Sequence, residues 1–218
     1  MRARPIVLCA AAAALLLLAA PRLGPAGGVA EAASFDCARA ATASDRAICA
    51  NPGLSALDGQ LGTLFAQRVA ADPALRQLQR GWIAARTAGC GGAVGCLTSL
   101  TSAQIAFLRS GAAQPPAALP HSAGACSLTR ITAVGTRLEN QPGSGSAVSE
   151  ANGGSQVSYD QIPAIDAARA GDAALVCLVS IPRHCPPGDA RGRVYAVADL
   201  RTLRAWSQAD SEHSCGGA

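Results

Sequence analysis

The side chains in this sequence best suited to chemistry are its cysteines. Cys9 lies in an apolar N-terminal run, and the other eight of the nine fall into two groups of four. An even cysteine count in an exported chain favours disulfides over catalytic thiols or metal ligands. The eight expected disulfide cysteines are Cys37, Cys49, Cys90, Cys96, Cys126, Cys177, Cys185 and Cys215.

The sequence favours particular pairings without fixing them. In the first group, Cys37–Cys49 and Cys90–Cys96 are preferred, because each bond would tie a turn of chain to a helix end. The crossed pairing, Cys37 with Cys90 and Cys49 with Cys96, stays open. Each bond would add about 2–4 kcal/mol to the stability of a core with few aromatic residues.

In the second group, local spacing again guides the prediction. A Cys177–Cys185 bond would hold a proline-rich loop against the strand before it. A Cys126–Cys215 bond would join the two ends of that half of the chain. All pairings are expected to stay within their own group of four.

Two other constellations suggest chemistry more weakly. His184, Cys185, His213 and Cys215 could offer zinc four ligands, but the Cys-x-x-Cys spacing of a strong zinc site is missing. Residues 210–214 combine Ser, His and Asp without a Gly-x-Ser-x-Gly nucleophile elbow. We therefore expect no metal, no cofactor and no enzymatic activity.

The N-terminus has the organisation of a cleavable export signal. Arg2 and Arg4 precede an uncharged apolar run, residues 6–20, and small residues at 30–33 offer a cleavage site. That run is shorter than the roughly 20 residues of a membrane span, although an uncleaved anchor is the alternative. We expect residues 1–32 to be removed, leaving a periplasmic or secreted protein without a stable membrane span.

The charge balance argues against nucleic acid as a partner. Removal of residues 1–32 takes three arginines and one glutamate with it and leaves 15 basic and 13 acidic residues. No basic run alternates with aromatic residues. All 18 basic residues are arginine, which with abundant Ala, Gly and Pro is typical of GC-rich bacterial coding.

The hydrophobic pattern divides the remaining chain into two parts of different type. Residues 34–110 predict a small disulfide-bonded helical domain, and residues 126–218 a small antiparallel β domain, which makes the fold class α+β. Residues 111–125, rich in Pro and Ala, predict a semi-stiff linker between them.

Helix-start signals recur through the first part. Thr42 with Asp45 fits a capping box, and Asn51-Pro52 and Asp72-Pro73 combine a capping side chain with proline at the first helical position. The last helix is predicted over 97–109. Three or four short helices around an aliphatic core are expected.

The second part changes to short β-prone runs separated by Gly, Pro, Asn and Asp. Five strands at this spacing predict a small antiparallel sandwich or open barrel. The predicted strands cover residues 128–134, 156–159, 175–181, 194–197 and 203–206.

An ordered set of residues in the first part resembles the LprI-type, lysozyme-inhibitor-like family over about residues 34–110. The resemblance implies an exported, small, helical fold and lysozyme as a partner. The named member of that family is a lipoprotein, whereas this chain lacks a lipid-attachment motif. The residues that carry the resemblance are Phe35, Asp36, Cys37, Ala38, Ile48, Cys49, Leu54, Leu57, Asp58, Leu61, Gln79, Trp82, Arg86, Cys90 and Cys96.

Three of these residues share one helix face. Gln79, Trp82 and Arg86 stand at i, i+3 and i+7. The structural interpretation is a core tryptophan, with Arg86 either stacking on it or binding a helix C-terminus. The functional interpretation is a partner-binding surface formed by Trp82 and Arg86.

A Gly-Ser-Gly-Ser run, residues 143–146, offers a second candidate contact. It resembles the Ser/Gly loops by which some periplasmic inhibitors of a different, β-barrel family enter the lysozyme cleft. That cleft holds two carboxylates, one of them protonated, so an inhibitor needs hydroxyl or guanidinium donors on a slim loop. Ser144, Ser146 and Arg137 meet this need, and a flexible hairpin tip is the alternative.

Together these features predict an exported binding protein rather than an enzyme. Lysozyme inhibition that protects the cell wall is the specific hypothesis, and its contrary point is the small net charge, which does not complement a strongly basic lysozyme. The alternative is an envelope interaction or scaffold module with another envelope protein as partner.

Overall fold

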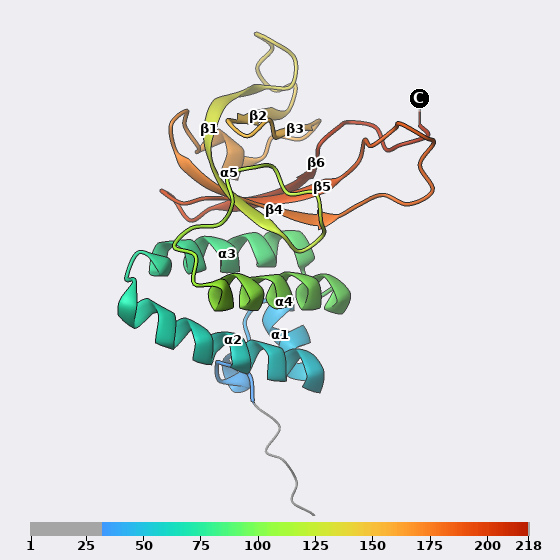
Figure 1. Ribbon diagram of the computed structural model, residues 1–218. Helices are drawn as coiled ribbons and strands as arrows, with labels where there is room; N and C mark the ends of the chain where they lie inside the picture. Colours follow the sequence, from blue (N-terminus) through green and yellow to red (C-terminus); the bar gives the residue numbers. More distant parts are fainter. Residues whose placement is uncertain (1–31, 218) are drawn as a thin grey trace, which may run out of the picture.

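Four helices stack beneath one face of a six-stranded sheet in the computed structural model (Figure 1). The structure describes residues 32–217, so the predicted signal peptide lies almost entirely outside the described residues. Helical and antiparallel β parts follow one another along the chain, which confirms the α+β class. None of the described helices has the length and apolar character needed to cross a membrane.

The first two helices begin where the capping signals predict. In α1 (Ala43–Ala50), the Thr42 hydroxyl accepts from Asp45 N at 3.0 Å, and the Asp45 carboxylate accepts from Thr42 N at 2.9 Å. Burial opposes ionisation of Asp45, but the hydrogen bonds with Thr42 and Ala41 and the charge of Arg86 together keep the pKa of Asp45 below its usual value. In α2 (Pro52–Ala71), Asn51 Oδ1 accepts from Leu54 N at 2.9 Å.

The other two helices depart from the prediction at their starts. Asp72 accepts from Ala74 N and so caps a turn that lies before α3. As a result, α3 (Leu75–Cys90) begins two residues after Pro73. The last helix, α4 (Val94–Ser110), begins three residues before the predicted position 97. A short 3₁₀ helix, η1 (Cys37–Arg39), precedes α1.

The second half forms a single antiparallel sheet with the strand order β3-β2-β1-β4-β5-β6. The prediction of five strands is wrong by one, because β2 was missed. In β2, Ser146, Val148 and Glu150 point inward, so its buried face carries only one large apolar side chain. The strands are β1 (Cys126–Thr136), β2 (Ser146–Glu150), β3 (Ser155–Ser158), β4 (Ala173–Ser180), β5 (Val194–Asp199) and β6 (Ala205–Ala209).

The sheet curves into half a barrel, and Gln156 joins its two edge strands. The amide of Gln156 donates to the carbonyls of Tyr195 and Gln208 at 2.8 and 2.9 Å. Its oxygen accepts from Trp206 Nε1 at 2.7 Å. Gln156 is 1% exposed, so a neutral amide with every bond satisfied lies inside the curved sheet. The short helix α5 (Pro163–Asp166) packs on the face opposite to α1–α4.

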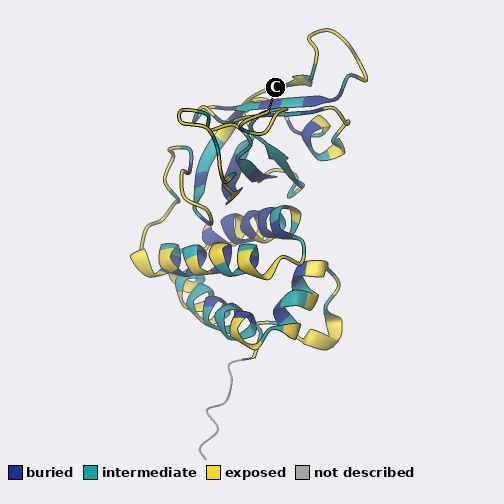
Figure 2. Ribbon diagram, turned by 90° about the vertical axis from the view of Figure 1, so that its right-hand side faces the viewer, coloured by how far each residue is buried: buried dark blue, intermediate teal, exposed yellow. Residues whose placement is uncertain are grey.

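Helix α3 lies directly against the other face of the sheet and is the most buried of the helices (Figure 2). A side chain at Gly81 would collide with Leu200, and one at Gly89 with Val179 and Ala196. These two glycines therefore allow the α3 backbone to approach β4 and β5 closely. One cluster of buried apolar side chains joins helices and sheet, from Ile48 and Trp82 to Leu175 and Leu200.

The disulfides confirm the first group of pairings and overturn the second. Cys37–Cys49 and Cys90–Cys96 are formed, with sequence separations of 12 and 6. The structure pairs Cys126 with Cys177 and Cys185 with Cys215, so the predictions Cys177–Cys185 and Cys126–Cys215 are wrong. The reason is strand order: β1 lies beside β4, and Cys126 stands opposite Cys177 in the register.

Residues 111–125 connect the end of α4 to the start of β1 and pack along both. Arg68 of α2 donates to the carbonyls of Gly111 and Ala112 at 3.2 and 3.0 Å. Leu128 N donates to Pro116 O at 3.0 Å, and Gly124 N donates to Leu178 O at 2.8 Å. The segment is thus held by hydrogen bonds at both ends.

Candidate interaction site

The residues of the helical motif converge on one buried carboxylate, Asp58. The backbone N–H and hydroxyl of Ser34 both donate to Asp58 Oδ2, at 3.0 and 2.6 Å. Arg86 NH1 donates to Asp58 Oδ1 at 3.1 Å, and the two side chains of this ion pair are only 5% and 4% exposed. A buried ion pair needs such additional hydrogen bonds to offset its lost hydration.

Trp82 and Arg86 form a stack inside the helical part. The guanidinium carbon of Arg86 lies 4.8 Å from the centroid of the Trp82 ring, as the structural interpretation of this helix face predicts. Gln79, on the same face, accepts from Gln104 Nε2 at 2.9 Å. Trp82 is 1% exposed, so neither it nor Arg86 presents a surface to a partner in this conformation.

A cavity of about 270 Å³ adjoins this buried network. Phe35, Asp58, Trp82 and Arg86 line it, and Ile83 stands at its exposed edge. Trp82 Nε1 and Arg86 Nε have no hydrogen-bond partner within the described part of the chain. Two N–H groups of the lining residues are thus buried without a partner beside a space of roughly nine water molecules, at about 30 Å³ each.

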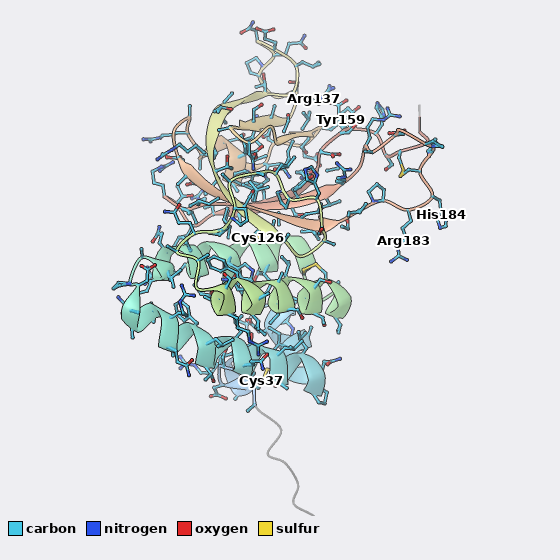
Figure 3. All side chains as sticks on the ribbon, in the orientation of Figure 1. Cys37, Cys126, Arg137, Tyr159, Arg183 and His184 are labelled. Carbon is cyan, nitrogen blue, oxygen red and sulfur yellow. A yellow bond between two sulfur atoms is a disulfide. The ribbon has the colours of Figure 1, made fainter. Side chains whose placement is uncertain are left out.

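The other predicted contact residues lie at the opposite end of the molecule, where β1 and β2 project away from the helices (Figure 3). Arg137 Nε donates to Ser144 O at 2.9 Å, and the Ser144 hydroxyl accepts from Leu138 N at 3.0 Å. These bonds close the base of an exposed loop, residues 138–143, which we call the hairpin tip. The bonds hold the tip in one orientation, with the Ser144 O–H still available as a donor.

Arg137 is itself held by two residues from distant segments. Its guanidinium carbon lies 4.3 Å from the Tyr159 ring centroid, and NH1 lies 3.4 Å from Glu212 Oε1. Tyr159 OH donates to Glu212 Oε2 at 3.0 Å. That hydrogen bond and the charge of Glu212 raise the pKa of Tyr159. Tyr159 is 58% exposed, so this cluster combines an aromatic surface with charged groups of both signs.

Ser146 is close in sequence to the hairpin tip but lies inside the protein. It is 0% exposed, donates to Asp166 Oδ1 at 2.7 Å, and accepts from Ile162 N at 2.8 Å. A side chain at the neighbouring Gly145 would collide with the carbonyl oxygen of Ser158. Ser146 and Gly145 therefore fix the base of the hairpin, whereas Ser144 and Arg137 stand at its surface.

A disulfide occupies both sulfur atoms of the zinc site considered from the sequence. Cys185 and Cys215 are bonded to each other, so neither can serve as a thiolate ligand beside His184 or His213. No group of three or more His, Cys, Asp or Glu arranged for a metal occurs among residues 32–217. Arg183 and His184 extend outward on the loop that this disulfide anchors (Figure 3).

Sequence reasoning missed two members of these networks and one isolated buried carboxyl. Ser34 and Tyr159 gave no signal, because their partners lie 24 and 53 residues away. Glu150, a buried carboxyl in β2, was missed together with its strand. Its burial raises its pKa to about 7, and Oε1 has no hydrogen-bond partner in the described structure.

Comparison with known proteins identifies one part of the chain. Residues 37–108 match the family model described as "Lysozyme inhibitor LprI", which covers η1 and α1 to α3 and most of α4. Neither a curated protein nor a solved structure matches the chain. The match and the four disulfides indicate an extracytoplasmic protein. The helical region of this chain, with its buried Asp58–Arg86 pair, is thus similar to the LprI family of lysozyme inhibitors.

Proposed function

We propose that this protein is a binding protein of the periplasm or extracellular space that inhibits a lysozyme-type muramidase. The family match over residues 37–108 is the observation that carries the proposal. The N-terminal residues 1–32 act as its cleaved export signal. Its role is to bind, not to catalyse.

The hairpin tip, together with Arg137 and Ser144 at its base, is the contact surface that we assign to this function. An inhibitor that enters a cleft with two carboxylates needs donors on a narrow, preorganised loop. Ser144 retains its O–H proton, and Arg137 is positioned by Tyr159 and Glu212. A shallow hollow of about 600 Å³ follows the tip and includes Glu139, Asn140 and Pro142 in its wall.

The test is a turbidity assay of cell-wall lysis with the oxidised, purified protein. The panel includes neutral and acidic muramidases as well as basic ones, because a chain with few net charges does not favour a strongly basic partner. Slower lysis at micromolar protein is the expected result. No slowing with any muramidase would remove the proposal.

A matched pair of variants then locates the contact. Gln141→Trp adds bulk at the hairpin tip, whereas Gln67→Trp adds the same bulk on the exposed side of α2. We expect Gln141→Trp to weaken inhibition by about tenfold or more and Gln67→Trp to leave it unchanged. The reverse result would assign the contact to the helical region.

A scaffold module without inhibitory activity is the second candidate function. The burial of Trp82 and Arg86 favours this candidate. These two residues are the most specific part of the family pattern, and when buried they stabilise the fold. They therefore do not define a contact surface for a partner. Recovery of an envelope protein by the wild-type chain, in the absence of any effect on lysis, would support this candidate instead.

A further inference from the structure

Six arginines lie where the turns of the sheet meet the first turns of α3. All six are exposed. They come from α3, from β1, from the turn before β4 and from the β5–β6 turn. We call this set the arginine rim: Arg76, Arg80, Arg130, Arg169, Arg201 and Arg204.

Hydrogen bonds join these segments into one continuous surface. Arg130 NH1 donates to Gly171 O at 2.9 Å, in the turn that also holds Arg169. Arg201 extends to the same turn, where its Nε and NH2 donate to the two carboxylate oxygens of Asp172 at 2.8 and 2.9 Å. The Gln77 side chain, between Arg76 and Arg80, donates to the carbonyl of Leu200.

The carboxylates on these turns are already engaged. Asp172 is bound by Arg201, and Asp72 accepts from Ala74 N at 3.1 Å. Asp199 is 0% exposed and accepts from Thr202 Oγ1 at 2.7 Å. Of the six guanidinium groups, only that of Arg201 pairs with a carboxylate in the described part of the chain. The rim therefore presents five cations that lack an acidic partner within residues 32–217.

A cavity of about 850 Å³ opens beside the rim, with Arg130 and Ala173 in its wall. Its wall combines alanine and leucine side chains with amide, hydroxyl, imidazole and guanidinium groups, and no carboxylate belongs to it. Such groups hydrogen-bond to hydroxyl and carbonyl oxygens. The further polar lining residues are Gln114, His121, Thr129 and Asn152.

The chemistry of this surface distinguishes between classes of anionic partner. The large exposed hydrophobic residues of the described chain are Ile83, Val94, Leu138, Tyr159 and Ile181, and none belongs to the rim or the cavity. Protein interfaces and single-stranded nucleic acid sites use aromatic side chains, and membrane insertion needs apolar ones. A hydroxyl-rich anionic polymer can be bound by charged and polar groups, without exposed aromatic or large apolar side chains.

We propose that the arginine rim binds an anionic glycan, whose carboxylate or phosphate groups pair with the guanidinium groups while a sugar unit occupies the cavity beside Arg130. Guanidinium donors match both acidic groups in the same forked geometry. The site lies on the sheet and α3, apart from the hairpin tip, so it does not depend on lysozyme inhibition.

The test measures binding of the oxidised full chain to labelled glycans by fluorescence anisotropy. The probes are polygalacturonate, which carries carboxylates, phosphomannan, which carries phosphates, and neutral dextran. Arg76→Gln/Arg80→Gln/Arg204→Gln is compared with Arg39→Gln/Arg46→Gln/Arg183→Gln, which removes the same charge from exposed positions outside the rim. Circular dichroism checks that both variants are folded.

We expect one or both acidic glycans to bind, dextran not to bind, and affinity to fall with added salt. The rim variant should lose about tenfold in affinity, and the control variant less than about twofold. Preference for one acidic glycan identifies which anionic group is recognised. Equal losses in both variants, equal binding of dextran, or binding of neither acidic glycan would each overturn the proposal.

Discussion

The helical region and the sheet handle buried polar groups in different ways. In the helical region a full negative charge, Asp58, is compensated by Arg86 and by two hydrogen bonds from Ser34. In the sheet, Gln156 is neutral and fully bonded, but Glu150 has no compensating partner and its pKa rises to about 7. A buried carboxyl without a compensating partner, such as that of Glu150, is protonated more readily because burial disfavours its charged form.

The two regions also differ in their covalent cross-links. The disulfides of the helical region close short loops, with separations of 12 and 6 residues. Those of the sheet close long ones, with separations of 51 and 30 residues. In the chain-entropy account a longer loop restrains the unfolded chain more strongly, so the sheet depends more on its disulfides.

The largest effect should come from removing the charge of Asp58. Asp58→Ala leaves Arg86 buried without its partner, and we expect it to lower the free energy of unfolding by about 3–5 kcal/mol. Denaturant unfolding measures this. Asp160→Ala, at an exposed aspartate, should change stability by less than about 0.5 kcal/mol. Similar small effects for both variants would mean that the buried pair does not stabilise the fold.

The next effect compares one disulfide from each region. Replacing Cys126 and Cys177 by Ala should lower the free energy of unfolding by about 4 kcal/mol, and replacing Cys90 and Cys96 by about 2 kcal/mol, because of their different loop lengths. Denaturation of the two double variants at equal pH gives the comparison. A greater loss from the Cys90/Cys96 variant would contradict the proposed difference between the regions.

Glu150 should make stability depend on pH. Its pKa is raised from 4.5 to about 7 in the folded state, so folding favours the protonated form. Stability is therefore highest below pH 4.5, falls as the pH rises through about 7, and then levels off, with a total contribution of about 3 kcal/mol. Unfolding measured from pH 4 to 8 should show this fall in the wild type. Its persistence in Glu150→Gln would show that another group is responsible.

The smallest effect tests the local helix signals. Thr42→Ala removes the hydroxyl that accepts from Asp45 N and should cost about 1 kcal/mol. Thr42→Ser keeps that acceptor and serves as the control. A loss of equal size in the Ser variant would assign the effect to packing of the Thr methyl group and not to capping.

Short-range features of the fold were accessible from the sequence and long-range ones were not. The capping box at Thr42 and the Asn51 cap depend on residues three apart, so local chemistry was sufficient to predict them. The Cys126–Cys177 bond depends on which strands are neighbours, which the loop spacing does not reveal. The missed strand β2 shows the limit clearly, because its inward face is mostly polar.

The residues of the candidate site show the same difference between short-range contacts, which could be predicted, and long-range contacts, which could not. The Trp82–Arg86 stack could be predicted because the two residues lie four positions apart on one helix. The bonds from Ser34 to Asp58 and from Tyr159 to Glu212 join segments that only the tertiary fold brings together. Residue type therefore suggested Arg137 and Ser144 as contacts but could not show that Ser146 is buried.

The close packing of α3 on the sheet has a consequence for the order in which the chain is made. Gly81 and Gly89 rest against Leu200, Ala196 and Val179, which emerge roughly a hundred residues later in synthesis or export. Until those residues arrive, the apolar face of α3 remains without its cover, and a nascent chain halted before residue 200 would expose it to chaperones. The packing of the helical region is therefore completed only after the last strands of the sheet have been made.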